Sequence, residues 1–163
     1  MIFRNRAVRR RGDGTYVQSF HDSIPELLVD LGRQLDDILD SDDPDLRRLF
    51  PTAYPDDPEK DAGYQILARS DLTDARREAI ATVRRTATSE ILTEDELMDW
   101  MALTNDLRLV LGTKLDVGED DSNEIDPDDP DAPMIEIYHL LGVVLYEIVL
   151  ALSDGLPAAG KDD

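Results

Sequence analysis

The stretch TEDELMDWMALTNDLRLVLGTKL, from Thr93 to Leu115, decides the fold. Thr93 and Glu96 have the spacing of a capping box, which predicts that a helix begins here. Plotted at 100° per residue, its side chains form a broad apolar arc and a narrow polar sector. The polar sector holds Asp95, Asp99 and Asp106. The apolar arc must be buried against other elements, so we expect this helix to pack inside a bundle.

Arg108 lies within the apolar arc of this helix, close to the small residue Gly112. Because an unpaired buried guanidinium costs several kcal/mol, Arg108 needs a carboxylate partner or a route to water. The last apolar segment of the chain offers Glu136 and Glu147, which fall on one helical stripe. We predict a structural ion pair between Arg108 and one of them, with Glu147 favoured. The alternative is an anion-binding arginine in a pocket.

The rest of the chain adds further helical segments. One begins near Ser23, where Ser23 and Glu26 again have capping-box spacing. Two more cover residues 59–92, with a break expected near Ser70. Between the first and second helices, the proline-rich residues 41–64 predict a loop with one short turn.

The final segment, from Pro133 to about Leu152, is the most apolar part of the chain. It contains Glu136, His139 and Glu147, and charged residues are avoided at the centre of membrane-spanning helices. We therefore expect a buried core helix and no membrane association.

The N-terminal residues predict a β-hairpin, because IFRNRAVR and TYVQSF flank a turn signal at Asp13-Gly14. The expected fold class is mainly α, a helical bundle of four or five helices with this small N-terminal hairpin. We expect a single domain over residues 1–155, with the hairpin at 1–20, a solvated acidic loop at 116–131 and a flexible tail at 156–163.

Charge is distributed unevenly along the chain, which has 17 basic and 37 acidic residues and a net charge of −20. Five arginines precede the first acidic residue: Arg4, Arg6, Arg9, Arg10 and Arg11. The remainder is so acidic that it would repel a phosphate backbone, so direct binding of nucleic acid is disfavoured except through these arginines. These arginines could form an interaction arm, although we favour the interpretation that they contact the acidic helices of the same chain. We expect a protein partner and consider a homo-oligomer possible.

Catalytic and metal-binding patterns are sparse. Glu136 and His139 have the Glu-x-x-His spacing of di-iron bundles, but the pair occurs once and the usual ligand set is incomplete. The chain has no cysteine, no nucleophile elbow and no glycine-rich phosphate loop. We therefore expect no cofactor and favour a protein without enzymatic activity. The lack of cysteine fits a cytoplasmic location.

The segments LTEDELMDW and NDLRLVLGTKLD, together with the arginine-rich hairpin, RREAI and the apolar last helix, resemble an actinobacterial family. This family is catalogued as domain of unknown function number 2017, and Asn105, Asp106, Arg108 and Gly112 carry the most specific part of the likeness. The resemblance implies a small helical cytoplasmic protein without assigned catalytic residues. Some similar proteins are linked to transcriptional regulation under oxidative stress and rely on cysteines, which this chain lacks.

The resulting functional hypothesis is a non-enzymatic regulatory or protein-interaction protein associated with transcription. The alternative is a metal- or anion-binding enzyme or sensor built around Glu136, His139 and the buried Arg108.

Overall fold

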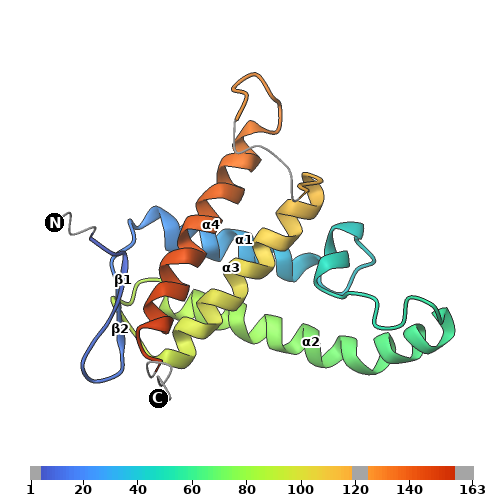
Figure 1. Cartoon of the computed structure of the whole chain (residues 1–163), viewed down its shortest axis with the longest axis horizontal. Coiled ribbons are helices and arrows are strands. Elements are labelled where there is room, and N and C mark those ends of the chain that lie inside the picture. The colour runs from blue at the N-terminus through green and yellow to red at the C-terminus, as the bar shows by residue number, and fades with distance from the viewer. Residues whose placement is uncertain (1–4, 119–124, 157–163) are drawn as a thin grey trace, which may run out of the picture.

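The computed structural model describes residues 5–118 and 125–156, and these form a mainly helical bundle with a small sheet at one end (Figure 1). In chain order the elements are β1 (Val8–Arg10), β2 (Tyr16–Gln18), α1 (Ser23–Ile38), the 3₁₀ helix η1 (Pro44–Arg48), α2 (Pro58–Thr86), β3 (Ile91–Leu92), α3 (Glu94–Lys114) and α4 (Ala132–Ser153). The predicted fold class is confirmed. Arg4, residues 119–124 of the expected acidic loop and residues 157–163 of the expected tail lie outside the described residues.

Helix α3 is the element around which the others pack, with α4 along one side and α2, α1 and η1 on the others. Its side chains Leu97 and Trp100 are fully buried. The indole Nε1 of Trp100 donates to the hydroxyl of Thr86 on α2 at 2.8 Å, so the one polar atom of this core residue is satisfied. The predicted capping box of Thr93 and Glu96 is confirmed, with both of its hydrogen bonds formed.

The sheet has the order β1-β2-β3 and is antiparallel throughout. The hairpin turn contains Gly14 at a φ of 84°, a conformation that glycine adopts without a steric cost. Val8 and Tyr16 are fully buried, so the hairpin packs against the helices. Strand β3 was not predicted, because its two residues are too few to produce an alternating pattern.

Helix α2 runs unbroken over 29 residues, so the expected break near Ser70 is wrong. Serine and aspartate cost only a few tenths of a kcal/mol in a helix interior when they are exposed, as Ser70 and Asp71 are. The start of α2 is fixed by Asp57, whose side chain accepts the backbone N–H of Lys60 at 3.0 Å.

The start of α1 also differs from expectation. Ser23 lies inside the helix, and the residue before it, Asp22, makes no side-chain cap. Instead Nδ1 of His21 accepts the backbone N–H of Ser23 at 3.2 Å. A histidine thus satisfies one free amide at this helix end, a role that the capping-box pattern does not reveal.

Helix α4 has two different faces. One face, with Leu141, Val144 and Ile148, is buried against the bundle. The opposite face exposes 55 % of Val143 and 55 % of Tyr146, so the expectation of a wholly buried core helix is wrong for this face. Within the described part of the chain, α4 alone is long and apolar enough to cross a membrane, a test that core helices of soluble proteins also pass.

Candidate interaction surface

A groove of about 360 Å³ lies between the C-terminal halves of α1 and α3. Leu35 and Leu107 are buried at its base, and Ile38, Val110 and Leu111 are only half-buried along its walls. Its full lining is Leu31, Gln34, Leu35, Asp37, Ile38, Asp43, Asp45, Leu107, Val110, Leu111 and Lys114. The volume falls within the range of ligand-binding clefts, and the walls have the apolar character of a peptide-binding groove.

The rim of this groove is acidic. Three aspartates, Asp37, Asp43 and Asp45, line it together with a single base, Lys114. Asp43 has a structural task, because its side chain accepts the backbone N–H of Asp45 at 2.9 Å and caps η1. Asp37 is exposed on α1 and has no ion-pair partner within the described residues. The groove therefore favours an apolar ligand that carries positive charge at its edges.

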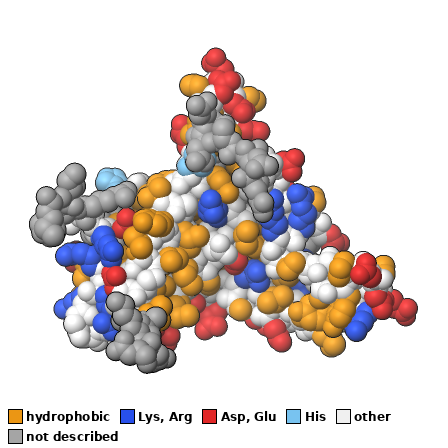
Figure 2. Space-filling model, in the orientation of Figure 1, with side chains coloured by type: hydrophobic (Ala, Val, Ile, Leu, Met, Phe, Trp, Pro, Cys, Tyr) orange, Lys and Arg blue, Asp and Glu red, His pale blue; other side chains and the backbone are white. Residues whose placement is uncertain are grey.

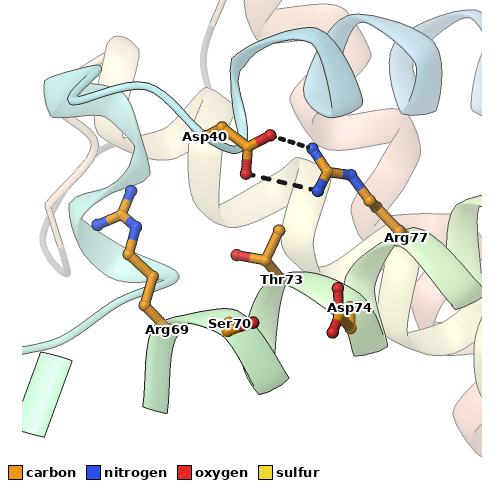
Figure 3. A pocket seen from close by; sticks show the side chains of 6 residues that line it. All are labelled: Asp40, Arg69, Ser70, Thr73, Asp74 and Arg77. Carbon is orange, nitrogen blue, oxygen red and sulfur yellow. Dashed lines mark hydrogen bonds and ion pairs between the residues drawn. The ribbon is translucent and has the colours of Figure 1, made fainter. Parts of the chain in front are cut away.

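A second, smaller cavity of about 200 Å³ lies between the end of α1 and α2 (Figure 3). Arg77 points into it and binds Asp40 at 2.7 Å and Asp36 at 2.7 Å, so one guanidinium joins α2 to a carboxylate of α1 and to one just beyond its end. The hydrogen bonds from Arg77 lower the pKa of the Asp40 carboxyl below its usual range.

Arg69, also at this cavity, donates to the carbonyl of Ser41 at 3.0 Å and lies 4.2 Å from the centre of the Phe50 ring. Arg77 thus joins α2 to α1, and Arg69 joins α2 to the segments that follow α1 and η1. We interpret the cavity as part of the framework rather than as a binding site.

The described residues do not form the predicted ion pair of Arg108. Glu147 is buried and accepts the backbone N–H of Ala7 at 2.9 Å, which ties the chain before β1 to α4. Glu136 is exposed. The guanidinium of Arg108 instead lies 4.6 Å from the centre of the Tyr138 ring, and its buried Nε has no hydrogen-bond partner.

Arg108 forms no ion pair with Glu136 or Glu147 because of where its guanidinium lies against α4. A Cβ added to Gly142 would lie 3.3 Å from the Arg108 Nε, so the missing side chain of Gly142 makes room for the guanidinium. Arg108 remains partly exposed, and the ring of Tyr138 covers one side of it. An aromatic face and a route to water therefore replace the carboxylate. Arg108 lines neither the groove between α1 and α3 nor the cavity of Figure 3. Neither of them is therefore the anion-binding pocket that the alternative requires.

The buried charge pair of α3 is formed by Asp106, which the helical plot placed in the polar sector. Its carboxylate lies 3.3 Å from Nε of Arg76 on α2, a distance typical of an ion pair but without hydrogen-bond geometry. Burial raises the pKa of Asp106 above its usual range, and the charge of Arg76 opposes this. Asp106 thus faces α2, whereas Asp95 of the same polar sector is exposed to solvent, and no pattern within α3 alone could show this difference.

The arginine arm is partly occupied by contacts within the chain. Arg6 pairs with Asp154 after α4, and Arg11 pairs with Asp13 in the turn. Arg9 and Arg10 are exposed on the edge strand β1, where no carboxylate of the described residues pairs with them.

The Glu-x-x-His pair of α4 gains no further ligand in the described residues, where no group of three or more His, Asp or Glu side chains could hold a metal ion. His139 lies against Tyr138, with the ring centres 5.8 Å apart. Glu136 is exposed to solvent on the same face.

Comparison with known proteins supplies a family for this fold. A family model described as Domain of unknown function (DUF2017) matches residues 5–152. The chain is 33 % identical over 127 residues to the "Oxidative stress regulator AosR" of Mycobacterium tuberculosis and of Mycobacterium bovis, covering 68 % of this chain and 58 % of each relative. It is 30 % identical over 146 residues to the "Putative oxidative stress regulator AosR" of Mycobacterium leprae, covering 79 % of this chain and 67 % of that protein.

No solved structure matches the chain. The match to the M. tuberculosis and M. bovis relatives spans less than two thirds of their length. The family model, by contrast, takes in every helix and strand of the fold except the final residue of α4. This protein therefore belongs to the DUF2017 family, as its sequence resemblance implied.

Proposed function

We propose that this protein is a non-enzymatic regulatory protein that binds a segment of another protein in the groove between α1 and α3. The observation that carries the proposal is the groove itself, whose walls are apolar and whose rim bears three aspartates. Its occupant is an amphipathic segment with apolar side chains that enter the groove and basic side chains beside them. A regulatory role is consistent with the name of the mycobacterial relatives, oxidative stress regulators.

The absence of cysteine constrains how such regulation would operate. A thiol switch within this chain is excluded, because no side chain here can form a disulfide. Regulation by the groove would instead follow the availability of the partner segment. Control of transcription, which the sequence resemblance suggested, is the setting in which we place this activity.

The test uses synthetic peptides of one helical design, with apolar residues at positions i, i+3, i+4 and i+7 and either Lys or Glu at the flanking positions. Binding to the whole chain is measured by fluorescence anisotropy, and the contact surface by NMR shifts of the methyl groups of Val110 and Leu111. We expect the Lys-flanked peptides to bind at least about tenfold more tightly than the Glu-flanked ones and to shift these methyl signals.

Matched variants locate the site. Val110→Gln, on the groove wall, should abolish binding, whereas Met98→Gln on another part of α3 should leave it unchanged. Asp37→Lys should remove the preference for Lys flanks, whereas Glu78→Lys on exposed α2 surface should not. Equal binding of both peptide series, or binding that survives Val110→Gln, would contradict the proposal.

A further inference from the structure

The outer face of α4 is an apolar surface that nothing in the described chain covers. Val143 and Tyr146 are more than half exposed and Val149 is 42 % exposed, and these positions lie on one side of the helix. In Figure 2 hydrophobic side chains follow the course of α4 across the molecule. Contiguous exposed apolar patches of soluble proteins mark interaction sites, which makes this face a candidate interface.

The two ends of α4 carry opposite charge. At its N-terminal end Asp128, Asp131 and Glu136 are exposed, and no basic residue lies between Asp116 and Asp154. At its C-terminal end the hairpin packs on the helix through the Ala7–Glu147 hydrogen bond and the Arg6–Asp154 pair.

The hairpin brings the exposed Arg9 and Arg10 to that C-terminal end. Figure 2 shows acidic side chains at the tip above α4 and basic ones around the hairpin, with further basic side chains in the middle of this face. The two clusters are separated by a helix of 22 residues, a length of about 33 Å.

We propose that the occupant is a second copy of this chain, docked with its α4 antiparallel to the first around a two-fold axis near Val143. A two-fold interface requires one surface to be complementary to itself, and this face meets that requirement only in the antiparallel sense. The hairpin arginines of each copy then lie beside the acidic end of α4 in the other. A parallel arrangement would place acid beside acid, in a chain whose net charge of −20 already opposes association.

The apolar centre and the charged ends have separate tasks in this dimer. Tyr146 and Val143 supply the desolvated centre, where aromatic side chains contribute most to affinity. The charges at the rim fix the antiparallel direction and make association sensitive to salt. The α4 face shares no lining residue with the α1–α3 groove, so each dimer would present two grooves to partner segments.

The first experiment measures the mass of the full chain by analytical ultracentrifugation over a range of concentrations and salt. We expect a monomer–dimer equilibrium that weakens as salt rises. Val143→Gln combined with Tyr146→Gln should weaken it by more than about tenfold, whereas Leu67→Gln, an equally conservative change at a 79 % exposed position of α2, should not. Circular dichroism verifies that each variant is folded.

The second experiment tests the direction. Glu136 and Leu150 are seven residues on either side of Val143 and on the same stripe, and the chain has no cysteine. A bismaleimide should cross-link a mixture of Glu136→Cys and Leu150→Cys chains far more than either variant alone. Reversing charge by Arg9→Glu should weaken the dimer, and adding Glu136→Arg should restore it.

Three results would overturn the inference. The first is a chain that stays monomeric at all concentrations, and the second is a dimer that the α4 substitutions leave intact. The third is a solution monomer that floats with anionic phospholipid vesicles in a Tyr146-dependent way, which would assign this face to a membrane surface. Loss of the dimer with retained peptide binding in the groove would overturn the dimer and leave the proposed function standing. A dimer that forms in a chain whose groove binds no peptide would remove the proposed function and leave the dimer standing.

Discussion

Arg76 and Arg108 are two partly buried arginines beside α3; each lies next to an aromatic ring, but their polar partners differ. Arg76 reaches from α2 to the carboxylate of Asp106, and it also donates to the carbonyls of Leu49 at 3.0 Å and Leu72 at 3.2 Å. Arg108 has no carboxylate within the described residues and stacks against Tyr138 of α4. Both guanidiniums thus lie near an aromatic ring, 5.0 Å from the centre of Phe50 for Arg76 and 4.6 Å from that of Tyr138 for Arg108. Within the described residues only Arg76 adds a carboxylate and carbonyl oxygens.

The difference shows that burial alone does not decide how a guanidinium is satisfied. The side chains of Arg76 and Asp106 are only 16 % and 12 % exposed, so each depends largely on the other as its charged partner. Arg108 keeps contact with solvent and uses its apolar stem and flat guanidinium for packing. The α2 flank of α3 should therefore be intolerant of change and the α4 flank tolerant.

The largest expected effect comes from Arg76→Met. Removing the guanidinium leaves Asp106 buried without a partner, so we expect a loss of about 3–5 kcal/mol in the free energy of unfolding, measured by urea titration. Arg108→Met should lose about 1 kcal/mol or less. Adding Asp106→Leu to Arg76→Met should recover most of the stability, because the buried charge is removed as well. Equal losses from the two single substitutions would erase the contrast between the flanks.

Two glycines provide the next test. A Cβ at Gly32 of α1 would lie 3.3 Å from Cδ2 of Leu103 in the packed core. Gly32→Ala should therefore destabilise the protein by about 1 kcal/mol or more, even with the gain in helix propensity included. At Gly142 the nearest atom is the Nε of Arg108, the movable end of a long side chain. Gly142→Ala should therefore stabilise by about 0.5–1 kcal/mol. Thermal unfolding shows whether the two changes have opposite signs.

The sequence predicted most of the fold because its signals are local. The capping box at Thr93, the turn at Asp13-Gly14 and the proline at the start of α4 each depend on a few adjacent residues. The errors have tertiary causes. The exposed Ser70 remains helical because it belongs to a long helix whose second half packs against α1 and α3. Strand β3 forms only because β2 lies beside it.

The candidate site was less predictable, since it depends on which face of each helix remains uncovered. The apolar stripe of α1 marks residues suited to burial, but it does not distinguish Leu35, which is buried, from Ile38, which lies half-exposed in the groove. The expected pairing of Arg108 with Glu147 failed similarly. The spacing of Glu147 was compatible with a contact, but the approach of the hairpin gave this carboxylate the N–H of Ala7.

A pH series separates burial from ion pairing at Asp106. Its pKa is raised in the folded state by burial, with Arg76 acting in the opposite direction, so its stabilising contribution is present below its ordinary pKa and is lost as pH rises through the raised value. The stability of Asp106→Asn relative to the parent chain should therefore improve from acidic to neutral pH, as measured by urea midpoints.

Glu96 is the matched control for that series. The backbone N–H of Thr93 and, less strongly, Arg85 lower the pKa of Glu96, so its contribution is present above its ordinary pKa and is lost as pH falls through the lowered value. Glu96→Gln should thus be less stable than the parent at neutral pH, with a difference that shrinks in acid. If the stability of both variants relative to the parent changed in the same direction with pH, the charge of Arg76 would outweigh burial in setting the pKa of Asp106.

The smallest expected effect is the coupling between Arg108 and Tyr138, which a double-mutant cycle with Arg108→Met and Tyr138→Leu measures. We expect about 0.5–1 kcal/mol, typical of a cation beside a partly exposed aromatic ring. The cycle is needed because Tyr138 also lies beside Gly112, where Arg48 approaches, so the single change disturbs more than one contact. Tyr138→Phe keeps the ring and should retain the coupling. If Tyr138→Phe abolished the coupling, Arg108 would depend on the hydroxyl of Tyr138, and its flank would be held by a polar contact much as that of Arg76 is.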